Sequence, residues 1–233
     1  MAKPMLQYKN RGYDRTLLLV PGWGFDERVF EPLRLPFNYL LYTSPDMAVL
    51  EDVVLSGGYG ALDMMGWSQG GVALAGLAVK YPEQVRQLIL VGIRPAYPVK
   101  GLNEIKDLLT RSCQTYLTCF YKACLDKTHL PWFKQTLQKT YLAKFKPEDL
   151  LAGLDWLAQV SLDAVALKKI RSVTVIHGVN DRVAPVQGAR VLAEQLPGAR
   201  YCEVSDAAHA VFLDPTFSET VTVGRQEGKK IRR

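Results

Sequence analysis

One serine in the sequence is set up for nucleophilic chemistry. The motif Gly-Trp-Ser-Gln-Gly, residues 66–70, ends a strand-like run and is followed at once by small residues that suit a closely packed helix. A serine that attacks a carbonyl carbon needs its Oγ at the carboxyl edge of a sheet, and a sharp turn from strand to helix puts it there. Glycines two residues to either side relieve the crowding of that strained turn. We therefore predict Ser68 as the nucleophile.

A neutral serine needs a base, and the chain has three histidines. His129 lies in a basic helical stretch, where we interpret it as a surface or hinge residue, and backbone geometry is enough to explain His177 at the end of a strand. His209 follows the last strand-like run, in the motif Ser-Asp-Ala-Ala-His. That is the place of the base when the chain order is serine, acid, histidine. We predict His209 as the general base.

The acid that orients this base is expected on a loop between the serine and the histidine. The motif His-Gly-Val-Asn-Asp-Arg-Val-Ala-Pro supplies Asp181, whose carboxylate would hold the His209 ring and stabilise its charged form. Asn180 is neutral, and Asp206 is better placed to fix its own loop by local hydrogen bonds. Asp214 is the remaining alternative. We predict Asp181 as the third member of a catalytic triad.

Two backbone N–H groups are predicted to stabilise the oxyanion that forms during the attack. Gln69 follows the nucleophile, and its N–H lies at the start of the expected helix. Trp23 lies between Gly22 and Gly24, after the first clear strand-like run. The glycines let this loop approach closely, so the Trp23 N–H can point inward. Each such donor typically lowers the barrier by ~3–4 kcal/mol.

The elements that must position these residues form an α/β pattern. Six apolar runs without strict alternation predict strands that are buried on both faces of a parallel sheet, at residues 16–22, 38–44, 61–66, 85–92, 172–178 and 199–205. Helix patterns follow at residues 69–85 and 185–198, and a final helix is expected after His209. The predicted fold is a mostly parallel sheet with helices on both faces.

The alternation of strands and helices is interrupted once. Residues 95–169 contain no strand pattern, and residues 103–125, 130–145 and 147–160 have the pattern of helices. Because strand patterns resume afterwards, we interpret this stretch as a helical lid inserted into one domain. Residues 1–94 and 170–233 would form the core.

Composition limits the class of protein. The chain has 233 residues, of which 48% are hydrophobic and 22% charged, as expected for a well-packed soluble domain. No apolar run approaches the length of a membrane span, and residues 1–15 lack the apolar core of a secretory signal. We expect a cytoplasmic protein that is a monomer and acts away from membranes.

The cysteines do not predict a metal site. Cys113, Cys119 and Cys124 lack paired Cys-x-x-Cys spacing, and on a helix Cys119 points away from the other two. Cys113, Leu117, Phe120 and Cys124 instead share one apolar stripe. We expect core cysteines, with no metal and no other cofactor.

Together these motifs resemble the α/β-hydrolase family, and the resemblance covers nearly the whole chain. The segments Leu-Leu-Leu-Val-Pro-Gly-Trp-Gly, Gly-Trp-Ser-Gln-Gly-Gly, His-Gly-Val-Asn-Asp-Arg-Val-Ala-Pro and Ala-Ala-His-Ala-Val-Phe-Leu-Asp-Pro fall in the family's order. The first two, and the stretch 150–170, are similar to the pimeloyl-acyl-carrier-protein methyl ester esterases of biotin synthesis. Against this pattern, an edge strand or loop is expected to be missing near the amino end or between Tyr42 and Leu62.

The resemblance implies a serine carboxylesterase with a carrier-bound methyl ester as substrate. It would attack the ester through Ser68 and release methanol, with the acyl channel lined by Trp23, Trp67 and Phe120. A general short-acyl esterase, a carbon–carbon bond hydrolase and an inactive acyl-binding protein are the alternatives. Nucleic acid is not an expected partner, because no recognition motif accompanies the basic residues.

Charge is concentrated in the middle of the chain. The net charge is +6, and residues 111–146 hold seven basic residues against the single acid Asp126. A basic lid complements an acidic acyl-carrier protein, although a solubilising surface explains the same charges equally well. The expected docking residues are Arg111, Lys122, Lys127, Lys134 and Lys139. The tail after Gly224 is also basic, as solvated chain ends often are.

Overall fold

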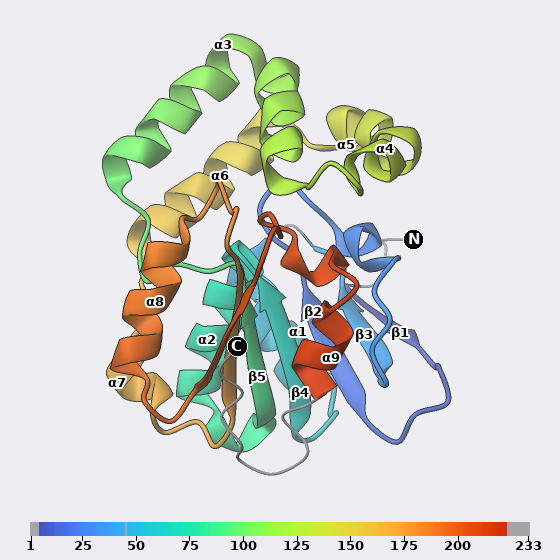
Figure 1. The fold of residues 1–233 in the computed structure, drawn as a ribbon, viewed down its shortest axis with the longest axis vertical. Coiled ribbons are helices and arrows are strands. Elements are labelled where there is room, and N and C mark those ends of the chain that lie inside the picture. Colours follow the sequence, from blue (N-terminus) through green and yellow to red (C-terminus); the bar gives the residue numbers. More distant parts are fainter. Residues whose placement is uncertain (1–4, 45, 223–233) are drawn as a thin grey trace.

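A seven-stranded sheet forms the centre of the computed structural model, which describes residues 5–44 and 46–222 (Figure 1). The strand order is β1-β3-β2-β4-β5-β6-β7, and only β1 runs antiparallel to its neighbour. The strands are β1 (Leu6–Lys9), β2 (Thr16–Val20), β3 (Asn38–Tyr42), β4 (Leu62–Trp67), β5 (Val85–Val91), β6 (Val173–Gly178) and β7 (Arg200–Val204). The predicted fold class is therefore confirmed.

The six predicted strands correspond to β2–β7. The sequence did not predict β1, which is short and mostly exposed and forms the edge of the sheet beside β3. The expectation that an edge strand or loop of the family pattern is missing near the amino end or between Tyr42 and Leu62 stays a prediction, because the presence of β1 does not test it. Such an edge strand carries little apolar patterning, because it buries few side chains, and its pairing comes from backbone hydrogen bonds with β3.

Successive side chains of each strand enter two different cores. In β2, Leu18 and Val20 pack with helices α1 (Leu50–Ser56), α2 (Gln69–Lys80), α7 (Ala164–Leu167) and α8 (Val186–Gln195). Leu17 and Leu19 face the other way, toward η1 (Glu27–Phe30) and α9 (Phe217–Thr222). Strands covered on both faces need apolar residues at every position, which explains the uninterrupted apolar runs.

Most of residues 95–169, called the helical segment below, stands over the end of the sheet that carries the carboxyl termini of the parallel strands, whereas α7 near its end packs beside α2 and α8 (Figure 1). Its main helices are α3 (Val99–Cys124), α4 (Leu130–Phe133), α5 (Lys139–Lys144) and α6 (Pro147–Gln159), and a π-helical turn (Lys134–Gln138) joins α4 to α5. The predicted apolar stripe of α3 is present, although the backbone leaves helical geometry at Ser112. Among the described residues, no helix combines the length and apolar character that a membrane span requires. The basic tail after Gly224 lies outside the described residues.

Candidate active site

Ser68 occupies the tight turn between β4 and α2. Its backbone has φ 53° and ψ −121°. Residues other than glycine rarely adopt a positive φ, so this turn is strained. The Ser68 N–H donates to the carbonyl of Val91 at 2.8 Å, which fixes the turn to the end of the neighbouring strand β5. The side chain is only 8% exposed. The local geometry is the one that the motif predicted.

The glycines around Ser68 are required by contact as well as by the turn. A Cβ on Gly66 would lie closer than 3.0 Å to the backbone of Gly70 and Gly71, and one on Gly70 would meet the Val20 carbonyl equally closely. A Cβ on Gly22 would touch the Ser68 Cβ at 3.2 Å. The β2 loop and the start of α2 therefore pack against each other with only backbone between them.

Asp181 and His209 meet, although 28 positions separate them in the chain. The His209 Nδ1 lies 2.7 Å from the Asp181 Oδ2, and both residues are buried, with exposures of 1% and 7%. A carboxylate only accepts hydrogen bonds, so the His209 Nδ1 carries the hydrogen and its Nε2 keeps a lone pair. That is the tautomer that a general base needs.

Four donors hold the Asp181 carboxylate. Oδ1 accepts from the backbone N–H groups of Val183 and Ala184, both at 2.8 Å, while Oδ2 faces His209 and His177. Burial disfavours the charged carboxylate, but the charge on protonated His209 and the hydrogen bonds from both histidines outweigh it. They hold the pKa of Asp181 well below its usual range, so this group stays ionised.

His177 has a role that the sequence interpretation missed. Its Nε2 lies 2.7 Å from the Ala184 carbonyl and 3.1 Å from the Asp181 Oδ2, and the residue is fully buried. The carbonyl can only accept, so the His177 Nε2 carries a hydrogen that it shares between two oxygens. The one sequence feature that could have indicated this contact is that His177 lies four residues before Asp181.

Trp67 contacts the loop that carries His209. Its indole N–H donates to the His209 carbonyl at 2.9 Å, the two rings lie 5.3 Å apart, and the side chain is 0% exposed. This position does not support the prediction that Trp67 lines the acyl channel. A buried indole places its N–H against a fixed acceptor, and here that acceptor belongs to the predicted base.

The Ser68 hydroxyl and His209 are neighbours without a hydrogen bond between them among the described residues. The end of β5 connects them, because Val91 accepts from the Ser68 N–H and a Cβ on Gly92 would lie 3.2 Å from the His209 Nδ1. Catalytic hydrogen bonds often tighten only when substrate is bound. The arrangement is therefore compatible with transfer of a proton from Ser68 to His209.

The two segments that carry the predicted oxyanion donors pack against each other. Gln69 is the first residue of α2, so its backbone N–H has no acceptor within the helix. The loop that carries Trp23 is closed by a hydrogen bond from the Phe25 N–H to the Gly22 carbonyl at 3.2 Å. Contact between Gly22 and Ser68 brings this loop to the nucleophile.

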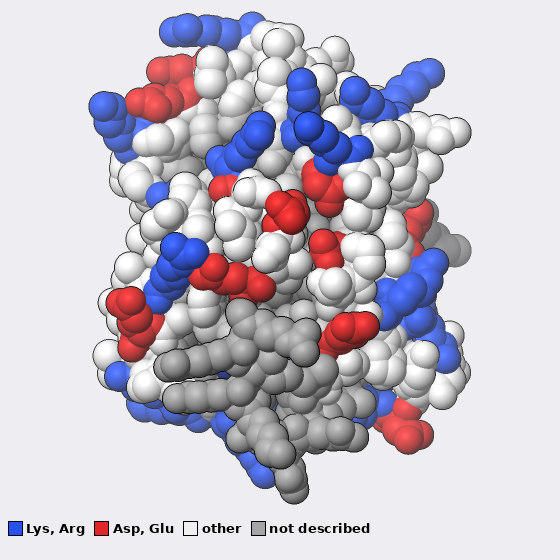
Figure 2. Space-filling view, viewed as in Figure 1, with Lys and Arg blue, Asp and Glu red and all other residues white. Residues whose placement is uncertain are grey.

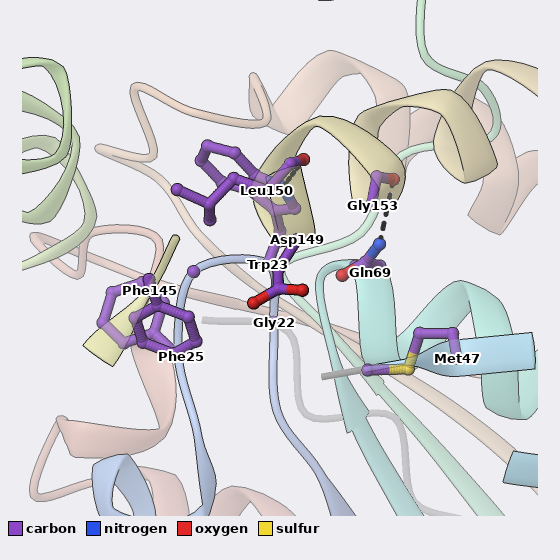
Figure 3. A pocket seen from close by; sticks show the side chains of 10 residues that line it. Gly22, Trp23, Phe25, Met47, Gln69, Phe145, Asp149, Leu150 and Gly153 are labelled. Carbon is purple, nitrogen blue, oxygen red and sulfur yellow. Dashed lines mark hydrogen bonds between the residues drawn. The ribbon is translucent and has the colours of Figure 1, made fainter. Parts of the chain in front are cut away.

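Helix α6 covers the oxyanion loop. The indole N–H of Trp23 donates to the Leu150 carbonyl at 2.9 Å, and the Gln69 side chain donates to the Gly153 carbonyl at 3.1 Å (Figure 3). Phe120 packs edge-on against Trp23 with ring centroids 5.0 Å apart. Aromatic residues of α3 and the loop thus form one apolar group, and the role of Trp23 and Phe120 in lining an acyl channel stays a prediction.

A small pocket lies between this loop and α6. Its volume is about 20 Å³, which is room for roughly one water molecule and not for an acyl chain. Figure 3 shows Trp23 and Leu150 on its upper side, with Phe25 and Phe145 on another. An acyl group could enter this pocket only if its side chains or α6 moved.

Asp26 ties the same loop to α5. The side chain is 4% exposed and accepts from the Tyr141 hydroxyl at 2.6 Å, from Lys144 at 2.6 Å and from Arg28 at 2.7 Å. Burial raises the pKa of Asp26, but these hydrogen bonds outweigh it and lower the pKa to about 2. Lys144, one of the basic residues of the charged stretch, is therefore engaged within the protein.

The remaining predicted residues lie away from Ser68. His129 is half-buried at the start of α4, where its Nδ1 lies 2.8 Å from the Asp126 Oδ2. The five expected docking residues are exposed, and Figure 2 shows Lys and Arg side chains over the helical segment; they are Arg111, Lys122, Lys127, Lys134 and Lys139. The described residues include no group of three or more His, Cys, Asp or Glu side chains arranged to hold a metal ion.

A family model described as "alpha/beta hydrolase fold" matches residues 41–216, which is most of the chain. A pimeloyl-[acyl-carrier protein] methyl ester esterase of Aromatoleum aromaticum is 27% identical over 84% of this chain and 92% of its own. The protein of the same name from Vibrio parahaemolyticus is 25% identical over 89% of this chain and 92% of its own.

Solved structures have the same fold. An esterase from Exiguobacterium antarcticum superposes with a TM-score of 0.82, at 18% identity, over 95% of this chain and 96% of its own. At that identity the likeness shows the arrangement of elements and does not identify a substrate.

Proposed function

The chain belongs to the α/β-hydrolase family and is a serine hydrolase of the esterase type, and on this premise we propose that it cleaves the methyl ester of a pimeloyl group bound to an acyl-carrier protein. The observation that carries the chemistry is the buried Asp181–His209 pair beside the Ser68 turn. The names of the relatives, together with the exposed basic side chains of the helical segment, support the substrate.

In the first half of the proposed reaction, the Ser68 Oγ attacks the ester carbonyl carbon while the His209 Nε2 takes its proton. The negative charge moves to the carbonyl oxygen, where the backbone N–H groups of Trp23 and Gln69 donate to it. Collapse of this intermediate breaks the bond to the alcohol oxygen. His209 returns its proton to that oxygen, methanol leaves, and Ser68 remains acylated.

In the second half, His209 takes a proton from a water molecule, whose oxygen attacks the acyl carbon. The new intermediate releases the Ser68 Oγ, which regains its proton from His209, and the carboxylic acid product leaves. Asp181 remains ionised throughout and stabilises the imidazolium that forms in each half. Its depressed pKa supports this role.

We assign the helical segment as a lid. Its contacts through Leu150 and Gly153 close the oxyanion loop, and its exposed lysines would meet the acidic surface of the carrier protein. Charge complementarity of this kind raises the association rate more than the affinity. Its contribution should fall as salt is added.

Methanol release from the methyl ester of pimeloyl-acyl-carrier protein tests the chemistry. The wild type is expected to release methanol, and Ser68→Ala is expected to lower the rate by about 10³-fold or more. A Ser68→Ala protein with wild-type activity would exclude Ser68 as the nucleophile. A wild type that hydrolyses neither this ester nor p-nitrophenyl butyrate would instead support the acyl-binding alternative.

Charge reversal on the lid tests the carrier. Lys134→Glu with Lys139→Glu is expected to lower kcat/KM for the carrier-bound ester by about 10-fold at low salt and to leave free methyl esters unchanged. Lys168→Glu with Lys169→Glu is the matched control, because it changes the same charge at exposed positions that follow α7, beyond helices α3–α6. Equal turnover of free and carrier-bound esters by all three proteins would favour a general short-acyl esterase.

A further inference from the structure

A buried tyrosine hydroxyl beside Ser68 is not used by the mechanism above. Among the described residues, the Tyr97 Oη is buried and has no hydrogen-bond partner. Burial raises the pKa of Tyr97 to about 12, while the nearby Ser68 hydroxyl lowers it without reaching hydrogen-bond geometry. The phenol therefore keeps its proton and can donate it in a hydrogen bond. A buried donor without an acceptor is costly unless the acceptor arrives with a ligand.

The segment that carries Tyr97 is held firmly in place. Leu162 donates its N–H to the Pro95 carbonyl at 2.8 Å, and Ala96 pairs with Ser161 in an isolated β-bridge. The Arg94 guanidinium lies 5.4 Å from the centre of the Tyr97 ring. These contacts hold the backbone just before Tyr97 and one face of its ring, so the position of the hydroxyl is built into the fold.

The sheet determines from which side Tyr97 reaches Ser68. Strand β4, which ends at Ser68, lies between β2 and β5. The oxyanion loop continues from β2, whereas Tyr97 follows β5, so the two approach the nucleophile from opposite sides. Gly92, at the end of β5, packs against the carbonyl and ring of His209. Tyr97 therefore lies on the His209 side.

The geometry of the tetrahedral intermediate then indicates which of its oxygen atoms would accept a hydrogen bond from Tyr97. Its oxyanion points to the Trp23 and Gln69 N–H groups, so its alcohol oxygen turns toward His209, which has to protonate it. Building on the function proposed above, we infer that the Tyr97 hydroxyl donates a hydrogen bond to this alcohol oxygen as its bond to carbon breaks. The proton itself still comes from His209, so Tyr97 stabilises the departing oxygen and remains a phenol.

Leaving-group dependence distinguishes this role from packing. Methoxide needs help to depart, whereas p-nitrophenoxide leaves as a stable anion. Tyr97→Phe keeps the ring and removes the hydroxyl, and it is expected to lower kcat/KM by about 10–100-fold for methyl butyrate and by less than about 3-fold for p-nitrophenyl butyrate. The acyl group is the same in both esters, and kcat/KM reports acylation in each.

Tyr116→Phe is the matched control. Tyr116 is also half-buried, its pKa is also raised to about 12, and its ring faces Trp23 on the other side of the nucleophile. This variant should leave the ratio of the two kcat/KM values unchanged. Equal losses on both esters in Tyr97→Phe, or no loss on either, would overturn the inference. A wild type inactive on both esters and on the methyl ester of pimeloyl-acyl-carrier protein would instead overturn the proposed function.

Discussion

The Asp181 carboxylate lies between two imidazoles, and we propose that only one of them acts as the base. The His209 Nε2 makes no hydrogen bond among the described residues, whereas His177 uses its Nε2 hydrogen for Asp181 and the Ala184 carbonyl. The His177 Nδ1 is buried without a partner among the described residues. We interpret His177 as a residue that positions the acid.

Replacement of each histidine by glutamine tests whether His209 is the base and His177 only positions Asp181. His209→Gln is expected to lower kcat by about 10³–10⁴-fold, because no group then takes the Ser68 proton. His177→Gln should lower kcat by about 10-fold or less, because the glutamine amide still donates a hydrogen bond to Asp181. The measurement is kcat on p-nitrophenyl butyrate, with circular dichroism of both variants as the check on folding. Equal losses would assign both histidines to catalysis.

At the scale of elements, the Ser68 turn depends on glycines that have no room for a side chain. Gly66→Ala forces a Cβ into the backbone of α2 and is expected to lower the free energy of unfolding by at least about 2 kcal/mol. In Gly76→Ala, on the open side of α2, the added Cβ meets nothing within 4 Å. This variant is expected to raise the free energy of unfolding by ~0.5–1 kcal/mol. Urea denaturation measures both. A fully stable Gly66→Ala protein would contradict the described packing.

The link between the oxyanion loop and α5 predicts a pH dependence. The Asp26 pKa of about 2 in the folded protein is below its ordinary 3.8, so its contribution to stability is present above about pH 4 and is lost as pH falls toward about 2. Asp26→Asn is expected to destabilise the protein by about 1–3 kcal/mol near pH 7. The difference in the free energy of unfolding between the wild type and Asp26→Asn should become smaller as the pH is lowered.

The measurement is the free energy of unfolding in urea at about pH 7 and about pH 3. Asp107→Asn serves as the control, because this exposed residue of α3 is expected to change stability by less than ~0.5 kcal/mol at either pH. An Asp26→Asn deficit that stays constant with pH would show that the ionised carboxylate contributes nothing through these contacts.

For the whole molecule, entry of an acyl group between the Trp23 loop and α6 would require that α6 moves while the sheet stays intact. Trp23→Phe removes the hydrogen bond to the Leu150 carbonyl and keeps an aromatic ring in place. Amide hydrogen exchange in α6 is expected to become about 10-fold faster, while β4 and β5 remain protected. The control is Trp132→Phe on α4, which should leave α6 unchanged. Unchanged exchange in both variants would exclude this contact as the restraint on α6.

Local patterns were enough to predict the sheet and the tight turn at Ser68. Buried parallel strands need apolar residues at every position, and the Ser68 turn needs glycines at fixed offsets, so both leave a signature within a few neighbouring residues. The order of serine, acid and histidine also predicted Asp181 and His209, which the structure brings together. The sequence by itself therefore determined the fold class and the residues most suited to the chemistry.

Only the tertiary structure decided how these residues are supported. Trp67 serves as a donor to the His209 loop, Asp26 binds α5, and Tyr97 brings an unpaired hydroxyl to Ser68. Each of these contacts joins positions far apart in the chain, and their partners follow from how helices and loops pack over the sheet. Hydrophobic periodicity and turn propensity describe only the neighbours of a residue along the chain, so they carry no information about which distant group it will meet.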